Sequence, residues 1–378
     1  MIEYVEIRNA ENREIIGIVD NASSVIWHSV YYGVGDFEIY APCTALNIEL
    51  LQIDNYVTQP NDKNIGVIEN IQITYNAQDG RMIVATGRFA KALLDRRLIY
   101  KMSGNSVSPT IISGNVENAA RSLVSQNAVA CAFDNSRNIS GLVLGASAGT
   151  SKVIVDEAGT ATQKQVTYEN LLSYTDELLA EYKMGAYCEL NEGNEIAYKV
   201  FDGADRSVDN VGNNQPIIFS QEFDNLITSD YLCETEEYKT AALVGGEGEG
   251  TARFCTLFKP SGLSGLDLRE TFINASSNSK TYKDDDGTEH TLTDAEYEQT
   301  LKALGQQKVA GLSITETFNG EVDLINSSFK YGENEDFYLG DIVTVQDNGI
   351  GLYMNTRVLE ILETQDESGY TIVAVFGE

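Results

Sequence analysis

The chain is 378 residues long, 42% of them hydrophobic, and a chain of this length is expected to form two or three domains. Its 57 acidic and 26 basic residues give a formal net charge of −31, which repels phosphate and argues against nucleic-acid binding and docking on anionic lipid. No run of about 18 apolar residues predicts a membrane anchor. The first residues alternate as a strand does, without the pattern of a signal peptide, so we expect synthesis in a cytoplasm.

Cysteine and histidine are too sparse to predict a metal centre. The five cysteines are far apart and form no CxxC pair, which indicates reduced and mostly buried thiols. His28 and His290 are the only histidines, so the chain has few of the ligands that zinc and haem sites need. The acidic run at Lys283–Gly287 lacks the ligand spacing of a calcium loop and predicts a solvated turn. A carboxylate-only calcium or magnesium site stays open, but we assign no metal, cofactor or catalytic residue.

Most of the chain has the alternating pattern of strands between Gly, Asn and Asp turns. Helical spacing occurs at Ala90–Leu98, Asn115–Ser125 and Tyr168–Lys183. A fourth helix is predicted near residues 293–310, because Thr293 and Glu296 have the spacing of a capping box. The predicted fold class is therefore mainly β with an α+β insertion and this capped helix.

Short motifs near the N-terminus recur in the same order near the C-terminus. The first set is Gly35-Asp36-Phe37-Glu38-Ile39, Val67-Ile68-Glu69, Gly80 and Ile83-Val84-Ala85. The second set is Gly340-Asp341-Ile342-Val343, Val358-Leu359-Glu360, Gly369 and Ile372-Val373-Ala374. The order predicts two duplicated β barrels, superposable around Gly35/Gly340 and Glu69/Glu360. Asp36 and Asp341 are expected to hold turns and not to catalyse a reaction.

The repeat suggests three domains. Residues 1–105 form the first β-barrel module, which strands near 215–240 complete. Residues 106–214 form an inserted α+β lobe with two of the helices. Residues 241–378 form the second β-barrel module, with a helical insertion at 293–310.

Two glycine-rich segments resemble catalytic or binding motifs. Gly145–Gly149 fits the G-x-S-x-G nucleophile pattern, but the segment after it has the pattern of a strand, and His290 is the only downstream histidine. Ser147 is therefore predicted to lie in a hairpin loop. Gly245–Gly250 lacks the Lys-Ser/Thr of a phosphate loop and carries two glutamates, so a hairpin tip is expected.

Carbohydrate chemistry has no specific signal in this sequence. With 57 acidic residues, no local pattern singles out a pair of catalytic carboxylates. Trp27 and the tyrosines suit a sugar site, but in strands such residues normally belong to the sheet surface or the core.

Together, several segments resemble the siphophage tail-hub family, which is related to myophage baseplate hubs and to the hub part of type VI secretion spikes. These segments are Val25–His28, Gly35–Pro42, Ala242–Thr251, Leu266–Glu270, Thr293–Gly305, Tyr338–Val343 and Val358–Gly377. The resemblance implies a homotrimer with two tube-type barrels per chain at the tip of a virion tail. It implies no enzymatic activity, and assembly in the cytoplasm of a host bacterium.

The implied partners are a distal tail or tail tube protein, a tape measure protein, and a spike, fibre or tail lysozyme component. In such a ring the acidic charge either provides solubility or lines a channel through which DNA passes without binding. Two other functions stay open: a host polysaccharide-binding module that serves adsorption, and a cell-wall hydrolase.

Overall fold

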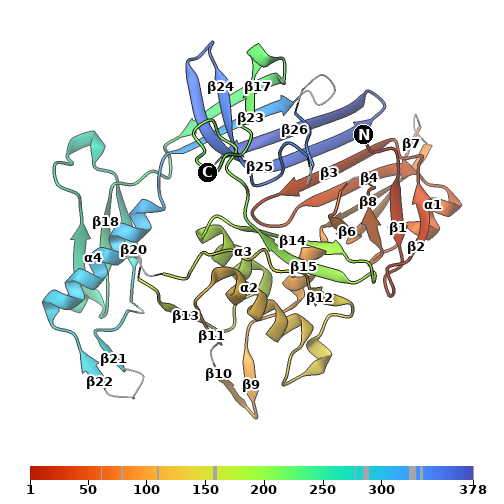
Figure 1. Cartoon of the computed structure of the whole chain (residues 1–378). Coiled ribbons are helices and arrows are strands. Elements are labelled where there is room, and N and C mark those ends of the chain that lie inside the picture. The colour runs from red at the N-terminus through yellow and green to blue at the C-terminus, as the bar shows by residue number, and fades with distance from the viewer. Residues whose placement is uncertain are drawn as a thin grey trace. The chain divides into compact units, whose positions relative to one another are not determined.

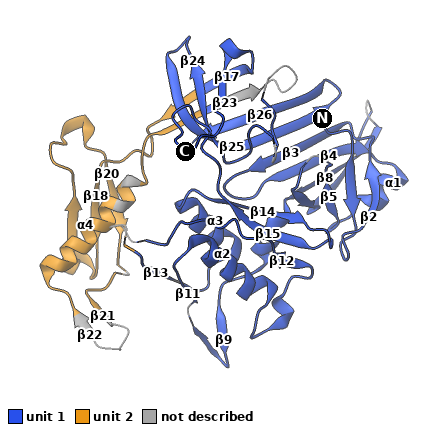
Figure 2. Ribbon diagram, in the orientation of Figure 1, with its two compact units in different colours: residues 1–156, 161–230, 318–378 blue, residues 157–160, 231–317 orange. Residues whose placement is uncertain are grey.

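The computed structural model describes residues 1–60, 62–77, 80–108, 110–155, 160–276, 278–283, 289–322, 329–332 and 335–377. They form two compact units, a larger one of residues 1–156, 161–230 and 318–378 and a smaller one of residues 157–160 and 231–317 (Figure 2). Strands outnumber helices in the described chain (Figure 1), so the predicted mainly-β fold is confirmed.

One large sheet dominates the larger unit. Its main run has the order β17-β23-β26-β25-β3-β4-β8-β7, and β24 and β16 continue it beside β25. These strands are β3 (Ser24–Val30), β4 (Asp36–Pro42), β7 (Asn70–Asn76), β8 (Gly80–Arg88), β16 (Ile218–Ser220), β17 (Leu226–Glu234), β23 (Thr315–Val322), β24 (Ile342–Asp347), β25 (Leu352–Asp366) and β26 (Gly369–Gly377). The chain leaves the larger unit along β17 and returns along β23.

Alternation along the strands decides which face of this sheet is buried. Val25, Trp27, Phe37 and Ile39 are at most 4% exposed and belong to one core cluster. Burying each side chain of this size contributes about 1.5–3 kcal/mol to stability. The residues between them point to the other face, since successive strand residues alternate.

A smaller sheet adds to this core. It has the order β2-β1-β5-β6 and consists of β1 (Val5–Arg8), β2 (Ile15–Val19), β5 (Tyr56–Thr58) and β6 (Ile65–Val67). Helix α1 (Ala45–Leu50) begins at Thr44, whose hydroxyl accepts from the Asn47 N–H. Gly17 of β2 permits close packing, because a Cβ there would stand 2.7 Å from a methyl group of Leu50.

The α+β lobe lies between the first and last strands of the large sheet in sequence. Helices α2 (Val116–Val124) and α3 (Leu171–Glu181) pack beside strands β14 (Gly185–Leu190) and β15 (Ile196–Phe201), as Figure 1 shows. The other elements are η1 (Ala90–Arg96), β9 (Lys101–Ser103), β10 (Ser106–Ser108), β11 (Thr110–Ser113), the π-helix η2 (Ser125–Val129), η3 (Asn135–Arg137), β12 (Leu142–Leu144) and β13 (Gln163–Val166). The three helices predicted in the first half of the chain are confirmed, the first as a 3-10 helix.

The smaller unit is a three-stranded sheet with one long helix. Its elements are β18 (Ala241–Gly245), β19 (Cys255–Phe258), β20 (Glu270–Asn274), β21 (Thr281–Lys283), β22 (Glu289–Thr291) and α4 (Asp294–Ala310). The predicted capping box is confirmed: the Thr293 N–H donates to Glu296 at 2.8 Å, and the Glu296 N–H donates to the Thr293 hydroxyl at 3.3 Å. Residues of β18 and α4 form a separate core that includes Val244, Tyr297 and Leu301.

This unit differs from the domain boundaries expected from the sequence. The second module was expected to span residues 241–378, but residues 241–317 belong to the smaller unit and residues 318–378 belong to the larger one. The physical reason is the separate core, because α4 covers β18 and the two bury their apolar side chains against each other.

Candidate functional site

The centre of the large sheet is a junction between strands from opposite ends of the chain. β25 pairs antiparallel with β3 over a continuous register, from Glu360 opposite Val30 to Asp366 opposite Ser24. The expectation of two separate barrels is therefore wrong in one respect, because strands of both segments lie in one sheet. An open edge exposes unpaired N–H and C=O groups, and this pairing satisfies them on both strands.

The strands have the same order on each side of this junction. One side is β3-β4-β8-β7, read from the junction outward, and the other is β17-β23-β26-β25, read from the far edge toward the junction. In this order β17, β23, β26 and β25 correspond to β3, β4, β8 and β7. Tight turns close the hairpins β7–β8 and β25–β26, with Asn76 opposite Gly80 and Asp366 opposite Gly369. Counted from these turns, Ile83-Val84-Ala85 and Ile372-Val373-Ala374 hold the same places.

The pairing corrects one of the sequence matches. Phe37 lies opposite Gly87 of β8, and Phe318 lies opposite Phe376 of β26. Gly87 and Phe376 are equally far from their turns, so the counterpart of Phe37 is Phe318. The expected match of Gly35 with Gly340 is therefore wrong. The two glycines share a Gly-Asp dipeptide without sharing a place in the sheet.

Asp341 has the structural role expected of it. Its carboxylate accepts the N–H groups of Ala204 at 2.7 Å and Tyr338 at 3.0 Å, and it pairs with Arg206 at 2.9 Å. These bonds tie the end of the α+β lobe to the start of β24.

The face of the sheet opposite the core carries charged groups at the junction. His28 lies between two carboxylates, with Nδ1 3.3 Å from Asp36 and Nε2 2.9 Å from Glu360. Glu38 alternates with the buried Phe37 and Ile39, and Asp366 follows from Glu360 at even spacing, so both share this face. Acidic groups therefore outnumber basic ones around the junction.

Arg88 is the main cation on the same face. Its guanidinium pairs with Glu69 at 2.9 Å and with Asp95 at 3.2 Å. The hydrogen bond from Arg88 lowers the pKa of Glu69 from its ordinary value. Arg88 is thus neutralised locally, and the face stays acidic.

The core side of the junction contains a second pair of carboxylates. The Tyr370 hydroxyl donates to Glu363 Oε2 at 2.5 Å, and the Asn64 N–H donates to Asp62 Oδ1 at 2.5 Å. Burial is the main cause that raises the pKa of both acids, and the charge of Asp62 raises the pKa of Glu363 further.

The G-x-S-x-G segment is a loop, as expected, but it is not the tip of a hairpin, because β12 pairs with β15 while Val153 and Val155 bridge Asn115 and Ala161. Strand β12 precedes Ser147, but residues 145–155 contain no helix. The buried Glu117 fixes this loop by accepting the N–H groups of Ala148 at 2.8 Å and Thr150 at 3.1 Å. His290 belongs to β22 of the smaller unit, and its side chain lies outside the described part of the chain.

The other motifs are also structural. Gly245–Gly250 joins β18 to β19 as an antiparallel pair, as predicted, and the Tyr297 hydroxyl accepts the Glu247 N–H at 2.8 Å. Trp27 is 0% exposed and packs on Phe37 and Phe89, so it lines no surface sugar site. Among the described residues, no group of three or more His, Cys, Asp or Glu side chains is placed to hold a metal. The acidic run at Lys283–Gly287 falls largely outside the described residues.

A comparison with protein-family models identifies the family of this chain. The model of the siphovirus ReqiPepy6 Gp37-like proteins matches residues 4–378. The chain belongs to this family. The resemblance to siphophage tail proteins inferred from the sequence is thereby confirmed. A search of curated protein sequences found no significant match.

Two solved tail proteins show the same fold at low sequence identity. A tail protein of Neisseria meningitidis MC58 aligns with a TM-score of 0.57 at 12% identity, over 99% of this chain and 96% of that one. The 43 kDa tail protein of prophage MuSo2 from Shewanella oneidensis aligns with a TM-score of 0.57 at 10% identity, over 99% and 98% of the two chains. A component of the type VI secretion system of E. coli aligns with a TM-score of 0.41 at 11% identity, over 94% and 73%. Within the described residues, no helix is long and apolar enough to span a membrane.

Proposed function

We propose that this protein is the hub of a phage or phage-like tail tip, where three copies close the tail tube as a ring. The observation that carries the proposal is the β3–β25 junction, which joins two four-stranded halves of the same strand order. Each half then acts as one tube-type module, so three chains supply six modules. A ring of this kind matches six-fold symmetry on one side and three-fold symmetry on the other.

The two ends of the strand run support closure of the ring. β7 and β17 are the outer strands of this run. β7 corresponds to β25 of the other half, and β17 corresponds to β3. Pairing β7 of one copy with β17 of the next repeats the internal junction between chains. The edges expose apolar side chains for this contact, among them Ile73 and Tyr75 of β7 and Ile227 of β17, at 53%, 73% and 57%.

The acidic face of the sheet suits the inner wall of such a ring. The opposite face is occupied by the core around Trp27 and Phe37, so the face with Asp36, Glu38 and Glu360 is the one free to line a channel. An acidic wall keeps phosphates from condensing on it and lets DNA pass.

The remaining roles follow from this position. We infer contacts with a distal tail or tail tube protein and a tape measure protein on one side, and a spike, fibre or tail lysozyme component on the other. The protein itself has a structural and not an enzymatic role. The buried position of Trp27 removes the feature that favoured a polysaccharide-binding module.

Edge-strand variants test the ring. Ile73→Lys and Ile227→Lys place charges on the two outer strands and should abolish incorporation into tails, while the purified chain stays folded by circular dichroism. Ile350→Lys is the matched control, because Ile350 is 63% exposed in the turn between β24 and β25. Normal tails with both edge variants would refute closure through β7 and β17.

A further inference from the structure

The α+β lobe contains a group of cations that contrasts with the acidic chain. Four of the 26 basic residues, Arg96, Arg97, Lys101 and Arg137, come together around the end of η1 and η3. Three of them, Arg96, Arg97 and Arg137, line one cavity of about 310 Å³ with Tyr100 and Ser136. We call this the arginine cavity.

Arg137 is the unusual member of the group. Its residue is only 7% exposed, and its Nη1 is buried with no hydrogen-bond partner. Nη2 donates to the Leu98 carbonyl, and the guanidinium carbon lies 3.9 Å from the centre of the Tyr100 ring. A buried charge without a counter-ion is strongly destabilising, so this site calls for an anion.

The part of the chain that the structure describes supplies no carboxylate to balance this charge. Among the residues that the structure describes, no acid is within ion-pair distance of Arg97 or Arg137. Asp134 is close enough for Arg137 to contribute to lowering its pKa, but Ser136 is the main cause, since its hydroxyl and N–H donate to that carboxylate at 2.6 and 3.0 Å. Arg96 pairs outward with Asp54 at 3.0 Å.

Arg97 adds a second guanidinium to the same place. Its Nε donates to the Arg137 carbonyl and its Nη1 donates to the Arg96 carbonyl at 2.8 Å, which fixes the group beside Arg137. Burial, with the neighbouring charges of Arg137 and Arg96, lowers the pKa of Arg97. The N–H groups that these two guanidinium groups do not use on backbone carbonyls can donate to the oxygens of a carboxylate.

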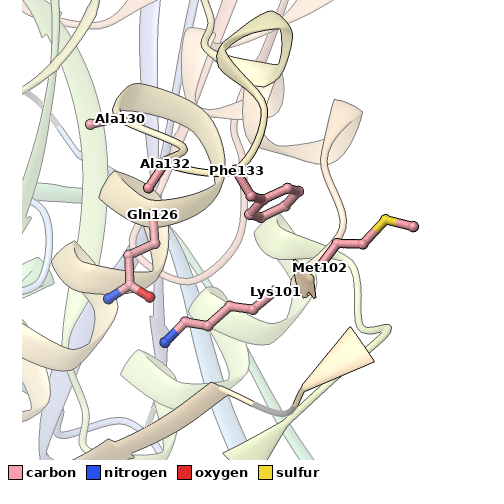
Figure 3. A pocket seen from close by; sticks show the side chains of 6 residues that line it. All are labelled: Lys101, Met102, Gln126, Ala130, Ala132 and Phe133. Carbon is pink, nitrogen blue, oxygen red and sulfur yellow. The ribbon is translucent and has the colours of Figure 1, made fainter. Parts of the chain in front are cut away.

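An apolar cavity adjoins the arginine cavity. It measures about 440 Å³ and is lined by Met102, Gln126, Ala130, Ala132, Phe133 and Lys101 (Figure 3). Phe133 packs against Tyr100 with ring centres 5.2 Å apart, so the two aromatic rings form the wall between the cavities. The Gln126 Oε1 atom is buried and has no partner. It belongs to the π-helix η2, a local distortion that is common at functional sites.

We propose that the lobe binds a segment of a partner protein through a carboxylate held by Arg97 and Arg137, with an apolar side chain of the same segment in the adjoining cavity. A carboxylate is favoured over phosphate because the anion site shares a wall with a cavity of hydrocarbon and aromatic groups. The site is independent of the ring proposed above, since it uses no residue of the large sheet.

Small probes test the two parts of the site on the full-length chain. We expect 3-phenylpropionate, which joins a phenyl ring to a carboxylate, to bind at least about tenfold more tightly than its neutral amide, since one charge-assisted hydrogen bond is worth that factor. Ligand-observed NMR measures both affinities, and this comparison needs no variant. Equal affinity of the acid and the amide would overturn the proposal.

Variants then locate the binding. Arg97→Gln and Phe133→Ala should each weaken binding of 3-phenylpropionate by about fivefold or more. Arg81→Gln removes the same charge from an exposed site on β8 and should leave the affinity unchanged. Circular dichroism checks the fold of each variant. If inorganic phosphate bound as tightly as the carboxylate and with the same dependence on Arg97, the proposed ligand would be wrong.

Discussion

Tyr370 of β26 donates its hydroxyl to Glu363 of β25, 2.5 Å away, on the core side of the strand junction. Glu363 itself lies opposite Trp27 of β3. The Glu363 carboxyl group therefore contacts the half of the sheet that contains β25 and β26 and faces the half that begins with β3. Its protonation state should affect how the two halves pack at the junction.

The pH dependence of stability should reflect this group. The pKa of Glu363 is raised in the folded chain, by burial first and by the charge of Asp62 next, so folding favours the protonated form. Its contribution is favourable below the unfolded pKa of about 4.3 and is lost as the pH rises through the raised folded value. Glu363→Gln should therefore stabilise the protein near pH 7, by on the order of 1 kcal/mol, and flatten the profile between acidic and neutral pH.

Thermal or urea unfolding at several pH values measures this effect. Glu367→Gln serves as the control, because Glu367 lies in the exposed turn between β25 and β26. A lower stability of Glu363→Gln at pH 7 would contradict the assigned cause.

The lobe contains a buried ion pair that should be costly to break. Lys91 is 3% exposed and lies 2.8 Å from Asp176, which fixes η1 against α3. Asp176→Leu leaves the Lys91 charge without a partner and should destabilise the chain by about 3–5 kcal/mol. Asp54→Asn removes one charge of the exposed pair with Arg96 and suits the left-handed backbone at this position (φ 67°), so it should cost at most about 1 kcal/mol. Chemical denaturation distinguishes the two, and equal losses would count against the burial argument.

The two faces of the smaller unit should respond differently to truncation. Leu301 of α4 is 0% exposed, so Leu301→Ala should cost about 2–5 kcal/mol through the cavity that it leaves. Leu243, Leu257 and Phe272 pair across the opposite face and are 43% to 54% exposed. Leu257→Ala should therefore change the stability by less than about 1 kcal/mol. If Leu257→Ala lost as much stability as Leu301→Ala, the assignment of the core to the face covered by α4 would be wrong.

The acidic face should matter for DNA. Glu38→Lys together with Glu360→Lys reverses two charges beside His28 and should raise the affinity of the purified chain for DNA at low salt, with a steeper salt dependence. Electrophoretic mobility at increasing salt measures this change. Glu11→Lys with Glu14→Lys gives the same change of net charge at exposed positions near the N-terminus. If the control pair raised the affinity for DNA equally, the effect would depend on net charge alone and not on the acidic face.

Local patterns in the sequence predicted the elements better than they predicted the pairing. Alternation identified most strands, and Asn115 and Thr293 marked helix starts that the structure confirms. The matched Ile-Val-Ala motifs do hold the same places in their hairpins. The Gly-Asp motif misled the alignment, because Gly35-Asp36 begins β4, which pairs with β3 and β8, whereas Gly340-Asp341 precedes β24, which pairs with β25 and β16.

Such local patterns could not predict the long-range features of the structure. The joining of β3 to β25 depends on strands more than 300 residues apart, and no local signal specifies which edges meet. Arg137 was not singled out at all, because its lack of a counter-ion is visible only once the fold places every carboxylate. The separate core of residues 241–317 was missed because its strand pattern resembles that of the rest of the chain.

Electron microscopy of an assembled tail tip at a resolution that separates strands tests the central claim most directly. The account predicts three copies in a closed ring of six modules, with β7 of each copy paired to β17 of the next and Asp36, Glu38 and Glu360 facing the channel. A single copy in the particle, unpaired β7 and β17 edges, or a channel lined by lysine and arginine would contradict it.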